Sequence, residues 1–142
     1  ISRPFMDDWS PSDYDFLVKC LINTIETGGA VFGAFDEKGR LKAFASLEGG
    51  IFGRKHRYKD LSSLHVSAEC RRSGIGKKLF CMAALKAKAN GADRLYISAH
   101  SAVETQSFYL SMGCRDAEEI NALHAENEPC DRQMECDLSR FG

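Results

Sequence analysis

The sequence predicts an α/β fold, in which helices pack on a mixed β-sheet. Three observations indicate this class. Strand-like and helical segments alternate through the middle of the chain, a pattern typical of helices covering a sheet. The length of 142 residues is close to that of an ordinary single domain, so we expect one domain over residues 1–142. Hydrophobic residues make up 44% and charged residues 27%, which is usual for a globular core that needs no disulfide, metal or partner.

Periodicity and turn residues predict nine elements. In chain order they are a helix over 11–27, strands over 30–35, 41–48 and 61–66, a helix over 74–90, a strand over 94–99, a helix over 103–111, and strands over 114–120 and 131–138. The strand over 114–120 has the weakest pattern of the nine.

In the first half of the chain, glycines and polar turn residues support the predicted helix and strands. Cys20 and Leu21 share an apolar helix face, and the glycines at 28–29 end that helix. The next strand is almost wholly apolar and is expected to be buried. Polar residues at 36–39 connect it to its neighbour, which predicts a hairpin. The segment 49–60 contains three glycines and a basic cluster, so we expect a loop on the substrate side.

In the second half of the chain, the spacing of apolar residues supports the predicted helix and strand. Ile75, Leu79 and Ala83 fall on one face of the second helix, and Gly91 follows its end. The last strand alternates in a way that predicts one buried face. The residues of that face are Arg132, Met134, Cys136 and Leu138, in alternation with Asp131, Gln133, Glu135 and Asp137.

Composition excludes several classes of protein. The net charge is −1, from 19 basic and 20 acidic residues, which argues against general nucleic-acid binding. There is no apolar run of about 18 residues, so no membrane span is expected. The six cysteines form no CxxC pair and show no zinc-ligand spacing, so we expect reduced thiols, a cytoplasmic location and no metal. Because the first residue is Ile1 and not Met, a short preceding segment is expected.

The segment 70–78 predicts an anion site. A strand enters a turn with glycines and a helix follows, whose first backbone N–H groups have no partner within the helix. Gly74 and Gly76 carry no Cβ that would block a ligand. The helix dipole adds positive potential, so a phosphate group is the natural occupant.

The charges around that turn favour the same interpretation. Arg71, Arg72, Lys77 and Lys78 surround a helix N-terminus, where each cation costs about 0.3–1 kcal/mol, and the first turn has no acid. An anionic ligand would supply the missing charge; the alternative is a solvated basic face. The segment does not fit a Walker loop, and Leu79 stands where a Rossmann motif needs its third glycine.

Two motifs resemble those of one enzyme superfamily. Leu64-His65-Val66 followed by Arg71-x-x-Gly74-x-Gly76 is similar to motif A of the GNAT N-acetyltransferases, and Phe108-Tyr109-x-x-x-Gly113 is similar to motif B. The resemblance is strong from about Leu61 to Cys114. It implies the acyl-CoA N-acyltransferase fold, with acetyl-CoA as co-substrate and an amine as acceptor. Family members often dimerise, so a homodimer is one expectation.

The resemblance also implies the residues that bind acetyl-CoA. They are Leu64, His65, Val66, Arg71, Arg72, Ser73, Gly74, Ile75, Gly76 and Lys77. The backbone of Leu64 and Val66 would pair with the pantetheine arm in a splayed gap between the third and fourth strands, and the N–H groups from the turn would hold the pyrophosphate. Ala102 stands where the family often has a pantetheine-binding Asn, and Ser101 or Thr105 would have to replace that contact.

The reaction implied by the resemblance needs an acid and a base. We expect Tyr109 to protonate the departing thiolate, because burial makes a thiolate basic enough to take a phenolic proton; the alternative is that Tyr109 only packs the helix, as expected of Phe108. A backbone N–H near Val66 would polarise the carbonyl. Glu48 is the first choice for the base and His65 the second, although a water chain would also serve.

Three functions stay open. The first is acetylation of a small amine, the second is acetylation of a protein or peptide, and the third is CoA binding without catalysis. Acidic residues of the tail would suit a cationic acceptor, or they form a solvated face; they are Glu118, Glu119, Glu126 and Glu128. A hydrolase using His100, Ser101 and Glu104 is not supported, because the nucleophile-elbow motif G-x-S-x-G is missing.

Overall fold

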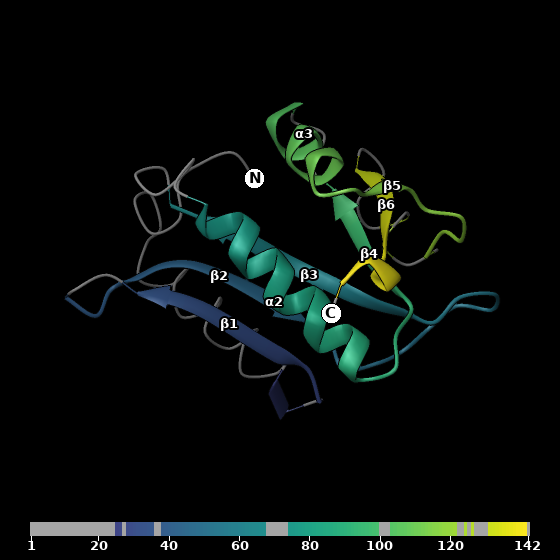
Figure 1. Cartoon of the computed structure of the whole chain (residues 1–142), viewed down its shortest axis with the longest axis horizontal. Coiled ribbons are helices and arrows are strands. Elements are labelled where there is room, and N and C mark those ends of the chain that lie inside the picture. Colours follow the sequence, from purple (N-terminus) through teal and green to yellow (C-terminus); the bar gives the residue numbers. More distant parts are fainter. Residues whose placement is uncertain are drawn as a thin grey trace. The chain divides into compact units, whose positions relative to one another are not determined.

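The computed structural model describes residues 25–26, 28–35, 38–67, 74–99, 103–121, 124, 126 and 131–141. Its elements (Figure 1) are β1 (Ala30–Phe35), β2 (Leu41–Leu47), β3 (Tyr58–Val66), α2 (Ile75–Ala89), β4 (Arg94–Ala99), α3 (Val103–Ser111), β5 (Arg115–Asp116), β6 (Arg132–Asp137) and the 3₁₀ turn η2 (Leu138–Arg140). The helix predicted over 11–27 lies, apart from two residues, outside the described part.

The strands form a mixed sheet. Hydrogen-bonded neighbours follow the order β1-β2-β3-β4-β6-β5, and every pair is antiparallel except β3 with β4. The α/β class predicted from the sequence is therefore confirmed. The antiparallel pairs involve hairpin and C-terminal strands, whereas β3 and β4 are joined through α2, as a parallel pair requires.

The chain divides into two compact units, and each is described by itself. Of the described residues, those within 25–50 and 61–83 form the hairpin unit, and those within 51–60 and 84–141 form the C-terminal unit. Both β3 and α2 contribute residues to each unit. The parallel pairing of β3 with β4 joins Tyr58–Asp60 to Arg94–Tyr96 and belongs to the C-terminal unit.

In the hairpin unit, β2 is the buried strand. Ala43–Leu47 are buried, and β2 pairs with β1 on one side and with β3 on the other. The prediction that β1 is a buried strand was wrong: it is half exposed, and Phe35 keeps 65% of its surface accessible. The reason is position, because among the described strands β1 pairs with β2 alone and forms an edge.

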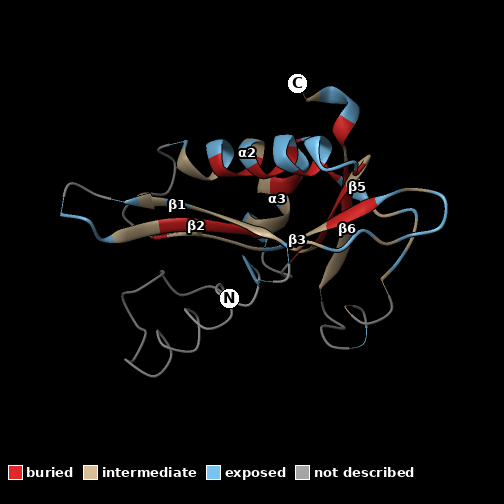
Figure 2. Ribbon diagram, turned by 90° about the horizontal axis from the view of Figure 1, so that it is seen from below, coloured by how far each residue is buried: buried red, intermediate tan, exposed pale blue. Residues whose placement is uncertain are grey.

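Helix α2 has one buried side (Figure 2). Leu79, Phe80, Ala83, Ala84 and Ala87 are buried, and the residues between them are largely exposed. The small alanines allow close packing along this stripe. At the C-terminal end, Gly91 adopts φ +98°, and its N–H donates to the carbonyl of Lys88 at 3.0 Å. This glycine ends the helix, as the sequence predicts.

The C-terminal unit is built around β4. Leu95, Tyr96 and Ile97 are almost completely buried, and β6 pairs with β4 along its whole length. Helix α3 contacts β4 and buries Tyr109. The last strand runs over Arg132–Asp137, one residue shorter at each end than predicted, and Glu135 is fully buried together with Met134 and Cys136.

Strand β3 starts earlier than the sequence predicts. The segment 49–60 was expected to be a loop and the strand to begin at Leu61, but β3 begins at Tyr58. Tyr58 and Lys59 are buried, and burial together with the charge of Lys86 lowers the pKa of Lys59. The prediction of a strand depends on alternating apolar residues, and the charged residues Lys59 and Asp60 interrupt that alternation.

Candidate active site

The N-terminus of α2 has the features of an anion site. Gly74 precedes the helix with φ +88°, and its carbonyl accepts the first helical hydrogen bond from Lys78 N at 3.0 Å. The N–H groups of Ile75, Gly76 and Lys77 then have no acceptor inside the helix. A Cβ added to Gly74 would meet no atom of the described residues within 4 Å, so from their side the backbone here can be approached closely. The first turn contains no acid, which leaves the dipole uncompensated by the helix itself.

The second element of this site is the end of β3. Leu64, His65 and Val66 pair with β2, and the N–H of Ser67 donates to the carbonyl of Lys42 at 2.8 Å. Antiparallel pairs alternate between hydrogen-bonded and non-hydrogen-bonded types, and this bond sets the phase. The backbone N–H and C=O groups of Leu64 and Val66 consequently turn away from β2. Their direction suits the added-strand contact that the resemblance implies.

Part of the expected site lies outside the described residues. This applies to Arg71, Arg72 and Ser73 of the turn, and to Ala102 and its neighbour Ser101 before α3. From the predicted turn, the structure describes Gly74, directly before the helix begins at Ile75. Lys77 and Lys78 are both exposed at the start of α2, so the positive charge of this helix end is accessible.

Tyr109 is buried in the C-terminal unit, on the side of α3 that contacts β4. Only 7% of its surface is accessible, and its ring lies 5.3 Å from that of Phe108 in an edge-on arrangement. Burial, followed by the nearby Cys114 thiol, raises the pKa of Tyr109. Its phenol therefore stays protonated near neutral pH, which is the state that a general acid requires.

The two residues named as candidate bases both lie in the hairpin unit. The hydroxyl of Ser62 donates to the Glu48 carboxylate, which is half-buried just after β2. His65 packs its ring against Phe44, with centroids 5.3 Å apart.

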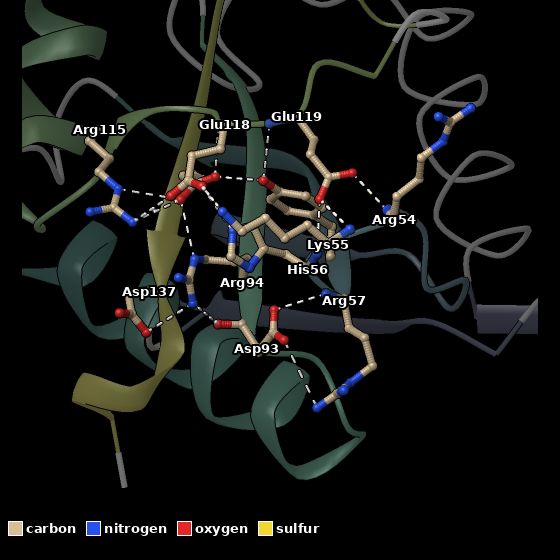
Figure 3. A network of polar contacts seen from close by, with 12 residues as sticks. Arg54, Lys55, His56, Arg57, Asp93, Arg94, Arg115, Glu118, Glu119 and Asp137 are labelled. Atoms are coloured by element: carbon tan, nitrogen blue, oxygen red, sulfur yellow. Dashed lines mark hydrogen bonds and ion pairs between the residues drawn. The ribbon is translucent and has the colours of Figure 1, made fainter.

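The basic segment predicted as a substrate loop is engaged with the chain's own acids (Figure 3). The carboxylate of Glu119 accepts hydrogen bonds from the backbone N–H groups of Arg54, Lys55 and His56, at 2.7 to 2.9 Å. Glu118 pairs with His56 at 3.2 Å. The Glu119 contacts are made to backbone groups, and the side chains of Lys55 and Arg57 stay 75% and 66% exposed.

A carboxylate–imidazole pair was missed by sequence reasoning. Nε2 of His124 lies 2.6 Å from Oδ2 of Asp60 in β3, and the imidazole stacks on Tyr96 of β4, with centroids 5.8 Å apart. The two residues are 64 positions apart, so no local pattern could join them. Because the sequence predicted a loop over 49–60, it gave no indication that Asp60 lies in a strand.

The chain matches a family model described as "Acetyltransferase (GNAT) domain" over residues 14–124. It belongs to the GNAT acetyltransferase family. The resemblance inferred from motifs A and B is thus confirmed, and the family supports acyl transfer with a CoA thioester as donor. No curated protein sequence matches the chain.

Solved structures share the GNAT fold at low identity. A GNAT-family acetyltransferase from Staphylococcus aureus Mu50 is 19% identical with a TM-score of 0.72, over 92% of this chain and 81% of that one. The PaiA N-acetyltransferase from Thermoplasma acidophilum, in complex with coenzyme A, is 21% identical with a TM-score of 0.64, over 89% and 71%. N-acetylglutamate synthase from Neisseria gonorrhoeae, with coenzyme A and N-acetylglutamate, is 19% identical with a TM-score of 0.65, over 84% and 27%.

Proposed function

We propose that this GNAT protein is an acetyl-CoA-dependent N-acetyltransferase that acetylates the primary amine of a small molecule. The observation that carries the proposal is the junction of β3 and α2 in the hairpin unit. There, backbone groups of Leu64 and Val66 turn away from β2, and Gly74 opens a helix whose first turn contains no acid. A polar strand edge followed by a helix N-terminus suits a ligand with an amide-containing arm and a pyrophosphate.

The binding residues are proposed on that basis. The pyrophosphate would contact N–H groups from Arg71 to Gly76, with Lys77 adding charge. The pantetheine would contact the strand Leu64–Val66. Two solved GNAT structures named above contain coenzyme A, which supports a CoA thioester as the donor. We propose that the acyl group carried by this thioester is acetyl.

Tyr109 is proposed as the general acid. The amine nitrogen attacks the thioester carbonyl carbon, the C–N bond forms, and the C–S bond breaks. A phenol kept protonated by burial can give its proton to the leaving thiolate. Glu48 is the sequence-based proposal for the group that first takes a proton from the ammonium. Its hydrogen bond from Ser62 holds the carboxylate in place.

The type of acceptor, the presence of turnover and the cellular location of the protein are also proposals. A protein or peptide acceptor, or CoA binding without turnover, would be compatible with the same fold. The described cysteines, Cys81, Cys114 and Cys136, are free thiols, which supports a reducing cytoplasm. Of the helices in the described part, none is both long and apolar enough to cross a membrane.

Two measurements on the same preparation test the function. Titration calorimetry with acetyl-CoA measures donor binding, and a thiol-release assay screens alkyl amines, amino sugars, amino acids and lysine peptides. Binding with thiol release for one class supports the enzyme and names its acceptor. Binding without release over the whole panel would favour a CoA-binding module, and an absence of binding contradicts the proposal.

A further inference from the structure

Two buried cysteines face each other in the C-terminal unit. Cys114 directly precedes β5 and keeps 4% of its surface accessible, whereas Cys136 lies in β6 and keeps none. The register of β5 and β6 pairs Arg115 with Glu135, and its continuation by one residue places Cys114 opposite Cys136. Both are free thiols, and the proposed acetyl transfer assigns a role to neither.

The phase of the β5–β6 ladder brings these two side chains close together. The N–H of Ala117 donates to the carbonyl of Gln133 at 3.0 Å, which makes these two residues a hydrogen-bonded pair. Because pair types alternate, Cys114 and Cys136, three positions along, are a non-hydrogen-bonded pair, and the N–H of Cys114 donates to Tyr109 at 3.0 Å instead. The Cα atoms of such a pair lie about 4.5 Å apart, within the span of about 4.4–6.8 Å that a disulfide bridges.

The two sulfur atoms also lie in a setting that favours ionisation of one of them. The thiol of Cys114 donates a hydrogen bond to the sulfur of Cys136, and this bond lowers the pKa of Cys136 against the opposing effect of burial. The Cys136 thiol is directed at the carbonyl of Met112, with Sγ and O 3.9 Å apart. Arg140 donates to the same carbonyl at 3.4 Å, and its positive charge favours the thiolate. Because the thiolate is the nucleophile in thiol oxidation, Cys136 is the sulfur that reacts first.

We propose that Cys114 and Cys136 form a reversible oxidation site, at which a peroxide converts the two thiols into a disulfide between neighbouring strands. The inference is independent of the proposed acetyl transfer. Strand β5 has only two residues, both exposed, and it lies at the edge of the described sheet. Local opening of this short segment gives a small peroxide access to the buried sulfurs. The disulfide closes a covalent loop over residues 114–136 and holds the start of β5 against β6.

The atoms and electrons of this oxidation balance. The Cys136 thiolate attacks one oxygen of hydrogen peroxide, the O–O bond breaks, and a sulfenic acid forms while the other oxygen takes up the thiol proton and leaves as water. The sulfur of Cys114 then attacks the sulfur of Cys136, the S–O bond breaks, and a second water leaves with the proton of Cys114. The two thiols lose two electrons in total, and the peroxide gains them. A dithiol reductant reverses the oxidation by thiol–disulfide exchange.

Peptide mapping after peroxide treatment tests the site. The folded protein is treated with hydrogen peroxide, the remaining thiols are blocked with N-ethylmaleimide in denaturant, and the chain is digested with trypsin without reduction. Cleavage at arginines places Cys114, Cys130 and Cys136 on separate peptides, which are 95–115, 116–132 and 133–140. We expect peptide 95–115 to be joined to peptide 133–140, with the loss of two free thiols, and to be released by dithiothreitol. Free or sulfinic cysteines in both peptides, or a bond from either to 116–132 instead, overturn the inference.

Urea unfolding tests whether the bond fits the folded strands. The oxidised wild type should unfold at a higher urea concentration than the reduced protein, because the closed loop restricts the unfolded chain. This shift should vanish in Cys114→Ala. The matched control is Cys81→Ala, which removes the other described thiol and should keep both the disulfide and the shift. A midpoint that stays or falls on oxidation of the wild type overturns the inference, and the wild-type measurements decide it even where Cys114→Ala does not fold.

Discussion

The phenol of Tyr58 donates a hydrogen bond of 2.6 Å to the buried carboxylate of Glu135, reaching from β3 past β4 to β6. The same carboxylate accepts from the N–H of Glu118 at 2.9 Å and contacts Arg94 and Arg115 at 3.2 Å each. Glu135 of β6 thus connects its own strand with β3, β4 and β5, and with the segment after β5, through one side chain. The alternation of β6 predicted one buried face, but this network buries Glu135 on the other.

Glu135→Gln should destabilise the fold. Glutamine can still accept from Tyr58, but it removes the charge that Arg94 and Arg115 share. Breaking a fully buried ion pair costs about 3–5 kcal/mol, and we expect about 2–3 kcal/mol here because the side chain of Arg115 is 56% exposed. Urea unfolding monitored by circular dichroism measures the change. Glu104→Gln, at an exposed site on α3, is the control and should stay within about 0.5 kcal/mol.

The same network predicts acid sensitivity. Burial alone would raise the pKa of Glu135, but hydrogen bonds from Tyr58, the N–H of Glu118 and Arg115 together hold that pKa below its ordinary value. A carboxylate whose pKa is depressed on folding contributes stability above its unfolded pKa of about 4.3. This contribution is lost as the pH falls through the lower folded value. The free energy of unfolding of Glu135→Gln should therefore depend less steeply on pH below about 5, and parallel curves would exclude this origin.

Gly74→Asp should abolish acetyl-CoA binding while the protein remains folded. The substitution places a carboxylate where the pyrophosphate is proposed to lie, and at least a hundredfold loss, about 2.8 kcal/mol, is expected in calorimetry. Gly39→Asp is a matched control, because both glycines have positive φ, +88° and +77°, and open space around a Cβ. Equal binding by the folded Gly74→Asp and Gly39→Asp proteins would refute the position of the pyrophosphate. Gly76→Asp is expected to act like Gly74→Asp.

Tyr109→Phe should lower kcat and leave the affinity for acetyl-CoA unchanged. Loss of a general acid typically costs about 10²-fold or more, whereas the ring that packs α3 on β4 is kept. Initial rates at saturating donor, with donor affinity measured separately, resolve the two quantities. Ser111→Ala, at the exposed end of the same helix, should behave as wild type. A full rate in Tyr109→Phe would leave the residue with its packing role alone.

Much of the fold could be predicted from the sequence because residues that become buried form local patterns along the chain. The apolar stripe of α2 and the glycines at its ends are local features, and the element lies within one residue of its prediction at each end. The strand over 94–99 and the helix over 103–111 match their predicted bounds, because β4 is apolar and Gly113 follows α3. Motif A is local in the same sense, since a strand, a turn and a helix N-terminus are adjacent along the chain.

The sequence by itself determined the α/β class and the family, and it predicts the place of an anion site, because each depends on residues that are neighbours in the chain. Only the tertiary structure decided that Glu135 is buried, that β3 begins at Tyr58 and that Asp60 meets His124. A polar residue becomes buried when distant segments supply its hydrogen-bond partners. Those partners are separated by 77 positions for Tyr58 and Glu135 and by 64 for Asp60 and His124, so chain folding alone brings them together.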